Sequence, residues 1–205
     1  MQIVVDWDGT VTVEDTLVMV LSEYGNWDVY QEAAAALARG EITLNGEIRR
    51  DFEPVTAPVD EVAEWLLERV EVRRGFRELA AEHPLLVVSS GFHELIEPLL
   101  EREGVQVELR ANRLDAQPDG WRVLFRNTEA CGTCGEPCKR SDLPVGEVVY
   151  VGDGYSDRCA ALAADRVFAR DGLARYLGER GVAFEPFGDF RDVIASVSAP
   201  APSRR

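Results

Sequence analysis

The sequence predicts an α/β protein with a Rossmann-like, doubly wound parallel sheet and a small inserted helical cap. Three short apolar runs, at residues 2–5, 85–88 and 147–151, have the composition of strands buried on both faces of a sheet. Each run ends in polar or acidic residues with glycines nearby. The stretch from Val13 to about Gly75 contains only helix-like segments. Because ligands bind at the carboxyl ends of strands in open α/β sheets, we expect the three polar ends to form one site.

The first strand-like run leads directly into the predicted cap. Helix-like segments there cover Glu14–Tyr24, Asp28–Arg39 and Asp60–Val70. Pro54 and Pro58 interrupt the helical pattern between the last two segments. The predicted domains are a catalytic core of residues 1–12 and 75–198, a helical cap of residues 13–74, and a disordered tail of residues 199–205.

The rest of the chain alternates between helix-like and strand-like segments. Helices are predicted from Phe76, over His93–Arg102, after Asp153, between residues 169 and 182, and over Phe190–Val197. Strands are predicted over residues 85–89, 105–109, 121–125, 147–151, 166–169 and 182–184. The turn Asp115–Gly120 precedes the run 121–125, which predicts a β-hairpin.

Asp6 and Asp8 stand two positions apart where the first strand ends, and Gly9 follows them. Two like charges buried side by side cost free energy unless a cation lies between them. A metal-dependent site, in which one aspartate attacks and the other moves a proton, meets that requirement. The alternative is an Asp-rich turn that caps a helix.

Lys139 is the only lysine among the 22 lysine and arginine residues of the chain. Because arginine is otherwise used throughout, a retained lysine indicates a role for a compact ammonium group. A tight site that holds both a carboxylate and a phosphate would need such a group. The alternative is a lysine retained by chance in a loop.

Polar groups also follow the other two strand-like runs. Ser89, Ser90 and Gly91 offer hydroxyls and backbone amides at a helix start, which suit a phosphate group. Asp153 and Asp157 follow the run 147–151, and glycines flank Asp153.

Taken in order, these groups resemble the four motifs of the haloacid dehalogenase (HAD) superfamily, in its phosphoserine-phosphatase-like branch. The motifs are Asp6-x-Asp8-Gly9-Thr10, Ser89, Lys139 and Gly152-Asp153-Gly154-x-x-Asp157. They extend over most of the chain, from residue 6 to residue 157. The resemblance implies an HAD-like fold for the catalytic core.

The resemblance also implies roles for the acidic residues. Asp6 would be the nucleophile that forms an aspartyl phosphate, and Asp8 would act as general acid and then as base. Asp6, Asp153 and the backbone carbonyl of Asp8 would bind Mg²⁺, a hard cation that takes oxygen ligands. Asp157 would either contact the groups that bind the metal, without binding it directly, or orient Lys139.

The remaining motif residues would serve the phosphoryl group. Ser89 and Lys139, with Ser90 and Gly91 beside them, would hold it during transfer. Phosphoryl transfer needs chiefly positioning and charge stabilisation, which hydroxyls, backbone amides and an ammonium group provide.

Four cysteines surround two of these motif residues in the sequence. Cys131, Cys134 and Cys138 form a C-x₂-C-x₃-C pattern directly before Lys139, and Cys159 lies two residues after Asp157. If Lys139 and Asp157 converge, the four thiols lie close together. The sequence allows a zinc cluster, a disulfide, or free cysteines in a tight loop.

The substrate is less well indicated than the chemistry. The Cys131–Cys134 segment resembles the methionine-salvage phosphatases that act on 2-hydroxy-3-keto-5-methylthiopentenyl 1-phosphate. The Cys138–Lys139 pair resembles phosphoethanolamine/phosphocholine phosphatases, and Ser90-Gly91-Phe92 resembles phosphoserine phosphatase.

Three further residues are candidates for substrate binding. Asp15 stands where phosphoserine phosphatase carries a substrate-binding Glu, so it either meets an amine or caps a helix. Arg49 and Arg50 either bind a substrate carboxylate or phosphate, or are solvated charges on a helix.

Composition limits the partners. The formal charge of −15 disfavours nucleic acid and anionic membranes, and no apolar run is long enough to span a bilayer. Because the first strand carries the candidate nucleophile, it cannot be a removable signal, and we expect a cytoplasmic protein. We expect a monomer or a homodimer that acts on a small phosphorylated metabolite.

The sequence therefore predicts a Mg²⁺-dependent phosphatase that works through an aspartyl phosphate. One alternative is a phosphotransferase that passes the group to an alcohol. Another is a non-catalytic protein on the same fold that senses metal or redox state through its cysteines.

Overall fold

The computed structural model describes residues 1–198, and the predicted disordered tail, residues 199–205, lies outside them. A seven-stranded sheet forms the centre, in the order β4-β3-β2-β1-β5-β6-β7. Neighbouring strands are parallel except for β3 and β4, which form an antiparallel hairpin. The predicted α/β fold with a mostly parallel sheet is confirmed.

The elements have the following bounds. The strands are β1 (Gln2–Val5), β2 (Leu85–Phe92), β3 (Glu108–Gln117), β4 (Gly120–Leu124), β5 (Val148–Gly152), β6 (Arg166–Ala169) and β7 (Glu185–Pro186). The helices are α1 (Thr16–Tyr24), α2 (Trp27–Ala38), α3 (Leu44–Phe52), α4 (Val59–Arg69), α5 (Phe76–Glu82), α6 (His93–Glu103), α7 (Arg158–Ala161), α8 (Asp171–Glu179) and α9 (Phe190–Val197). Two short turns are η1 (Trp7–Val11) and η2 (Lys139–Asp142).

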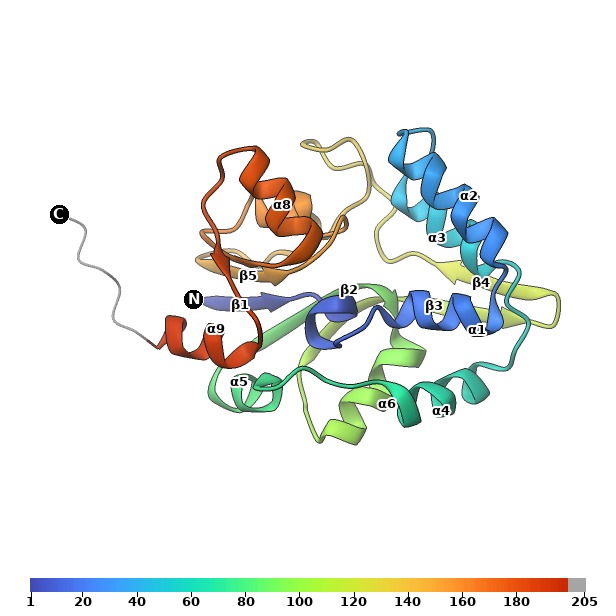
Figure 1. The fold of residues 1–205 in the computed structure, drawn as a ribbon, viewed down its shortest axis with the longest axis horizontal. Helices are drawn as coiled ribbons and strands as arrows, with labels where there is room; N and C mark the ends of the chain where they lie inside the picture. Colours follow the sequence, from blue (N-terminus) through green and yellow to red (C-terminus); the bar gives the residue numbers. More distant parts are fainter. Residues whose placement is uncertain (199–205) are drawn as a thin grey trace.

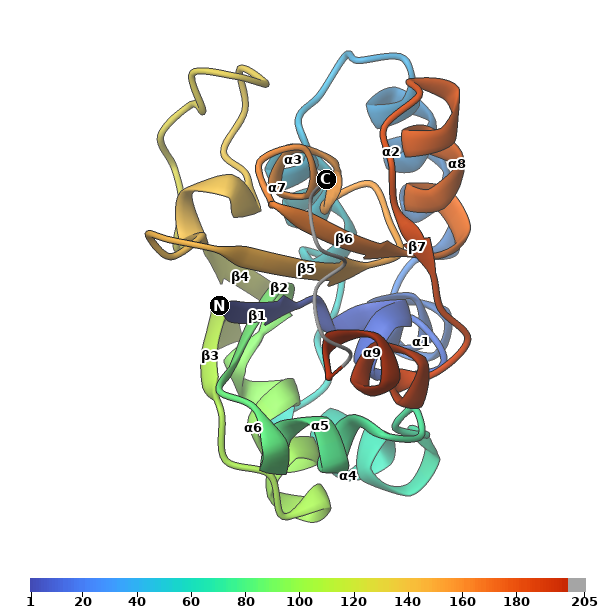
Figure 2. The same ribbon diagram turned by 90° about the vertical axis from the view of Figure 1, so that its left-hand side faces the viewer.

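Helices cover both faces of the sheet (Figures 1 and 2). Helices α4, α5, α6 and α9 lie on one face, and α7 and α8 lie on the other. The alternation along β1 explains the two layers, since Ile3 and Val5 enter the first hydrophobic cluster and Val4 enters the second. None of the helices within residues 1–198 has both the length and the apolar character needed to cross a bilayer.

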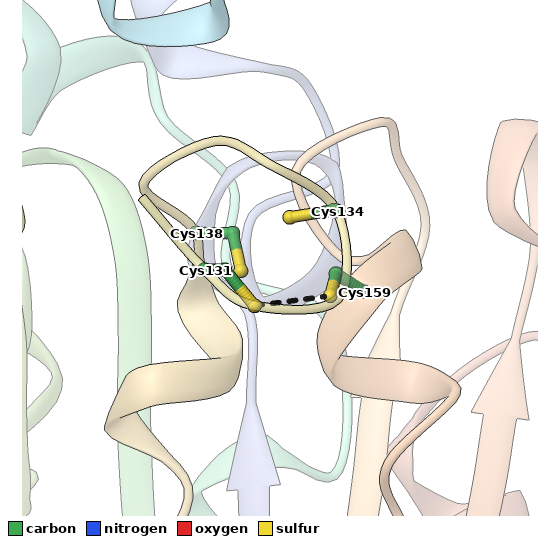
Figure 3. Close-up of side chains that lie close together, drawn as sticks. All are labelled: Cys131, Cys134, Cys138 and Cys159. Carbon is green, nitrogen blue, oxygen red and sulfur yellow. Dashed lines mark hydrogen bonds between the residues drawn. The ribbon is translucent and has the colours of Figure 1, made fainter. Parts of the chain in front are cut away.

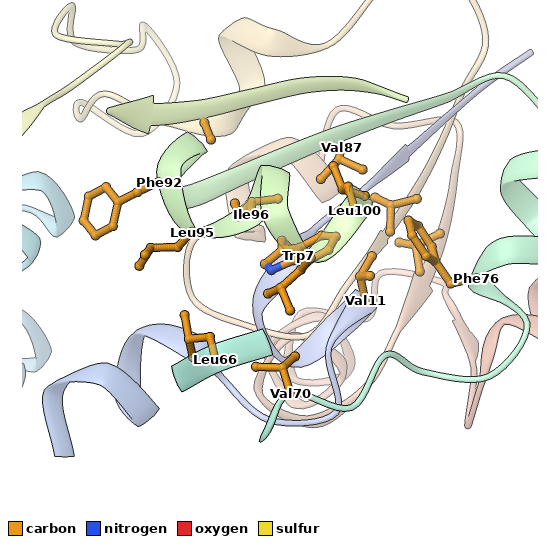
Figure 4. Close-up of a cluster of buried hydrophobic side chains, with 14 of the residues drawn as sticks. Trp7, Val11, Leu66, Val70, Phe76, Val87, Phe92, Leu95, Ile96 and Leu100 are labelled. Carbon is orange, nitrogen blue, oxygen red and sulfur yellow. The ribbon is translucent and has the colours of Figure 1, made fainter. Parts of the chain in front are cut away.

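The larger cluster forms around Trp7, directly after the first strand (Figure 4). Trp7 is fully buried and meets Phe76 edge-on, with 6.2 Å between the ring centroids. Leu66 and Val70, from α4 and the residue after it, pack into the same cluster. The backbone that carries Asp6 and Asp8 is therefore anchored by apolar packing on one side.

Helices α1 to α4 occupy the stretch predicted as a cap. Helix α2 packs on α3, and α3 packs on β4, beyond the carboxyl end of β1 (Figure 1). Helix α4 instead packs against α6 on one face of the sheet. The cap boundaries, residues 13–74, stay a prediction, and α4 lies with the core layers.

Some predicted elements differ from the structure. The strand predicted at 182–184 is wrong, because the last strand is β7, three residues later. Strand β3 begins at Glu108, so residues 105–107 precede it, and β2 extends beyond residue 89 to Phe92. Helix α3 was not predicted, since its sequence is polar and contains Gly46, whose amide donates to the capping Thr43 side chain at 3.2 Å.

The packing of α4 generates a stability prediction. We expect Leu66→Ala to lower the free energy of unfolding by about 2–5 kcal/mol, because it opens a cavity in the buried cluster that also contains Trp7. Leu124→Ala, at a position that is 56% exposed on β4, is the matched control and should cost less than about 1 kcal/mol. Urea unfolding of both variants measures the difference, and equal small losses would contradict the placement of α4 in the core.

Candidate active site

The candidate site lies where the three central strands end. Asp6 follows β1, Asp153 follows β5, and Ser89 lies in the last half of β2. These strands are neighbours in the sheet, in the order β2-β1-β5, so their carboxyl ends meet at one edge. Lys139 reaches the same place from the start of η2.

Lys139 is buried between two carboxylates. Its ammonium donates to Asp6 and to Asp157 Oδ1, the latter at 2.7 Å. Only 2% of Lys139 is exposed, and Asp6 and Asp157 are also buried. Burial alone would lower the pKa of Lys139, but Asp157 and Asp6 outweigh it and hold the pKa above its ordinary value. The lysine therefore stays charged.

Asp157 is held so that it can orient this lysine. Its Oδ1 also accepts from the Tyr150 hydroxyl at 2.8 Å, and its Oδ2 accepts from the amides of Asp153 and Gly154 at 3.0 and 2.9 Å. Because both carboxylate oxygens of Asp157 accept hydrogen bonds in this way, the geometry favours the alternative in which Asp157 orients Lys139.

Three carboxylates form a group that suits a divalent cation. Asp6, Asp153 and Asp157 each offer one oxygen, and these oxygens lie within 4.8 Å of one another. With Lys139 they carry a formal charge of about −2, which a dication would neutralise. Burial raises the pKa of Asp6 well above its ordinary value, Asp157 adds to the rise, and Lys139 opposes it. The donor set consists of hard oxygens and fits Mg²⁺.

The turn η1 brings Asp153 close to the first motif. Thr10 Oγ1 donates to Asp153 Oδ1 at 2.8 Å, and a Cβ at Gly9 would stand 2.5 Å from Asp153 Oδ2. Gly9 also has a φ of +75°, a conformation that side chains disfavour. A glycine is therefore required at this position for two separate reasons.

Asp8 lies beside this group rather than in it. Its Oδ1 accepts from the amide and the hydroxyl of Thr16, the amide at 3.1 Å, and its Oδ2 accepts from Ser89 Oγ at 3.2 Å. Burial raises the pKa of Asp8 to about 7; Asp15 adds to the rise and the Thr16 hydrogen bonds oppose it. A carboxyl group in this range can hold and release a proton near neutral pH.

Of the predicted phosphate-binding residues, Ser89 is buried, whereas Ser90 lines two cavities. Ser89 Oγ accepts from the Gly91 amide at 2.8 Å and is fully buried. Ser90 lines the cavity that contains Asp6 and Asp8, which has a volume of about 300 Å³. It also lines an adjoining cavity of about 390 Å³ that reaches Lys139 and the cysteine loop.

The three weaker substrate-binding candidates separate into two groups. Asp15 lines the 300 Å³ cavity and also caps α1, since its Oδ1 accepts from the Val18 amide at 3.0 Å. Arg49 and Arg50 are exposed and line neither of the two cavities. Arg49 instead packs over the Phe125 ring. This placement argues against a role for the two arginines at the site.

The four cysteines come together beside Lys139 (Figure 3). Cys131, Cys134 and Cys138 lie in the loop before η2, and Cys159 lies on α7. The four sulfurs lie within 4.8 Å of one another, and 3.9 Å separates those of Cys131 and Cys159. All four are free thiols in this structure. The disulfide that the sequence allowed as one alternative is not formed among these four cysteines of the described residues 1–198, since a bond requires sulfurs about 2 Å apart.

Sequence reasoning missed two arginines that support the site. Arg73 donates to the backbone carbonyls of Thr10 at 2.8 Å and Gly9 at 2.9 Å, and so braces the turn η1. Arg126 donates to the Ser89 carbonyl at 2.6 Å and pairs with Asp142 at 2.8 Å. Each is one of many arginines in the sequence, and no pattern distinguishes it from the others.

Comparisons with known proteins find relatives that are similar over most of the chain. A phosphatase of Lysinibacillus sphaericus named for 2-hydroxy-3-keto-5-methylthiopentenyl 1-phosphate is 29% identical over 94% of this chain and 91% of its own length. Its namesake in Geobacillus kaustophilus is 28% identical over 92% of this chain and 91% of its own.

Solved structures share the fold. A phospho-aspartyl intermediate analogue of phosphoserine phosphatase superposes with a TM-score of 0.69 at 19% identity and covers 95% of this chain and 97% of that one. Phosphoserine phosphatase from T. onnurineus superposes with a TM-score of 0.67 at 19% identity, over 96% and 93% of the two chains.

The family model for haloacid dehalogenase-like hydrolases matches residues 3–162, which include every residue of the four motifs. The matched stretch is well over half of the chain, and the curated relatives carry the names of phosphatases. The protein is a phosphoric monoester hydrolase, and its chain belongs to the haloacid dehalogenase-like hydrolase family.

Proposed function

We propose that the protein is a Mg²⁺-dependent phosphatase that hydrolyses a small phosphorylated metabolite through an aspartyl phosphate on Asp6. The observation that carries this proposal is the enclosed Lys139 ammonium between Asp6 and Asp157, with Asp153 beside them. Mg²⁺ held by Asp6, Asp153 and the backbone carbonyl of Asp8 would neutralise the charge of the carboxylates and the phosphate.

The residues divide the chemistry as follows. A carboxylate oxygen of Asp6 attacks phosphorus, and the bond from phosphorus to the ester oxygen breaks. Asp8 gives its proton to the departing alkoxide, then accepts a proton from the water that attacks the aspartyl phosphate and releases inorganic phosphate. Lys139 and the groups at Ser89, Ser90 and Gly91 hold the phosphoryl oxygens during both steps.

For the substrate, we propose 2-hydroxy-3-keto-5-methylthiopentenyl 1-phosphate as the first candidate, because the curated relatives carry that name. Phosphoserine and phosphoethanolamine or phosphocholine are the alternatives. Helices α1 to α3 would act as the cap that selects among them. Both the cytoplasmic location and the monomeric or homodimeric state stay predictions.

The sequence alone also allowed two functions other than hydrolysis, and each makes a distinct expectation. A phosphotransferase would release more alcohol product, without more free phosphate, when an acceptor alcohol is added. A non-catalytic sensor would have no use for both Asp6 and Asp8, whose pairing weighs against that alternative.

The first prediction concerns the nucleophile. We expect Asp6→Asn to lower the turnover of a generic aryl phosphate by at least about 1,000-fold, because an amide oxygen is a poor nucleophile toward phosphorus. Removing Mg²⁺ with a chelator should lower the turnover of the unsubstituted protein to a similar extent, and added Mg²⁺ should restore its turnover. Equal turnover by the two proteins would exclude Asp6 as the nucleophile.

The second prediction concerns the shape of the positively charged group at residue 139. We expect Lys139→Arg to lower kcat/KM by about 100-fold or more, because a planar guanidinium cannot replace an ammonium that is enclosed by two carboxylates. Arg140→Lys, the opposite exchange at the next residue, is the control and should keep the wild-type value. Steady-state kinetics of the two variants test this, and full activity of Lys139→Arg would contradict it.

A further proposal concerns the cysteine cluster, which we infer to hold one structural Zn²⁺. Sulfur ligands about 2.3 Å from a tetrahedral zinc lie about 3.8 Å apart. The 3.9 Å between Cys131 and Cys159 and the 4.8 Å limit for all four sulfurs agree with this arrangement. Because Cys138 directly precedes Lys139, the ion would tie the lysine loop to α7.

Metal analysis tests the zinc proposal. We expect about one zinc per chain in purified protein, and its loss together with reduced aryl phosphate turnover in Cys159→Ser. Ser141→Ala, close to the cluster but without a thiol, is the control and should keep its zinc. Purified protein that contains no zinc and exposes four titratable thiols would contradict the zinc proposal and favour the alternative of free cysteines.

A further inference from the structure

Asp51 is a buried carboxylate for which the proposed chemistry gives no role. It lies on α3, and only 4% of the residue is exposed. Its Oδ1 has no hydrogen-bond partner among residues 1–198. It lines the same 300 Å³ cavity that contains Asp6 and Asp8. A buried oxygen without a donor costs free energy, so the cavity lacks a hydrogen-bond donor that an occupant would bring.

The surroundings of Asp51 are mostly apolar. Leu21, Tyr30, Ile48 and Phe52 line the cavity with it, and these residues come from α1, α2 and α3. Burial raises the pKa of Asp51 to about 7, and the neighbouring carboxylate of Glu47 adds to the rise.

The charges in this cavity have a single sign. Asp15, Glu47 and Asp51 line its α1–α3 side, and within the described part of the chain no Lys, Arg or His side chain lines it. Arg126, Arg158 and Arg180 instead line the adjoining cavity on the side of the cysteine loop. A carboxylate on the leaving group would therefore meet like charge here, whereas a hydroxyl or an ammonium would meet an acceptor.

We propose that Asp51 determines substrate specificity by accepting a hydrogen bond from a hydroxyl or ammonium group on the leaving group. The proposal rests on the proposed phosphatase function, since it places the phosphate at Asp6 and the leaving group toward α3. It disfavours phosphoserine, whose leaving group carries a carboxylate. It agrees with the substrate named for the curated relatives, which by its name carries a hydroxyl group.

Binding measurements test this proposal independently of turnover. The parent protein is Asp6→Asn with Mg²⁺, and the probes are glycerol 3-phosphate, phosphoethanolamine, propyl phosphate and phosphoserine. We expect calorimetry to give at least about tenfold tighter binding of a donor-bearing probe than of propyl phosphate, which has no donor, and the weakest binding for phosphoserine. If glycerol 3-phosphate shows the larger preference over propyl phosphate, the donor is a hydroxyl group. If phosphoethanolamine shows it, the donor is an ammonium group.

Variants in the same background identify the residue responsible. Adding Asp51→Leu should abolish the preference over propyl phosphate, and Asp51→Asn, which keeps an acceptor oxygen, should restore part of it. Glu53→Leu, at an exposed position two residues along, is the control and should keep it. A preference that survives Asp51→Leu, or its absence from the parent protein, would overturn the proposal. Turnover of aryl phosphate by the unsubstituted protein reports on the phosphatase function separately.

Discussion

The ion pairs of Lys139 with Asp6 and Asp157 are the interaction on which the rest of the site depends. Lys139 lies between two buried carboxylates, and it is the group of opposite charge that both of them contact in this enclosed space. Much of the surrounding structure serves this arrangement. The order β2-β1-β5 brings the strand ends together, Tyr150 and two backbone amides fix Asp157, and the cysteine loop delivers the lysine.

The site combines two environments that suit different parts of a substrate. Around Asp6 the groups are charged and joined by hydrogen bonds, an arrangement that suits the positioning of a phosphoryl group. Toward α3 the same cavity is apolar and acidic, with an acceptor at Asp51 that has no internal partner within the described chain. In the function we propose, the first environment would serve phosphoryl transfer and the second would select the leaving group.

Much of this arrangement could be predicted from the sequence, because the relevant signals are local. Apolar runs that end in Asp6 and Asp153, and a lysine without a second copy, indicated which groups would meet. Elements whose form depends on distant partners could not be predicted. The edge strand β7 contains two residues, which are too few to form a recognisable strand pattern, and most positions of α3 are polar. Arg73 acts on carbonyls about 60 residues away, and Asp51 is notable only because folding buries it.

We propose that Asp6, one of the two carboxylates paired with Lys139, is the residue that takes the phosphoryl group. Borohydride reduction of protein quenched during turnover, followed by mass spectrometry, tests this most directly, because it converts an aspartyl phosphate to homoserine. We expect substrate-dependent homoserine at residue 6 alone. Homoserine at residue 8, 153 or 157, or none at any carboxylate during demonstrated turnover, would contradict it.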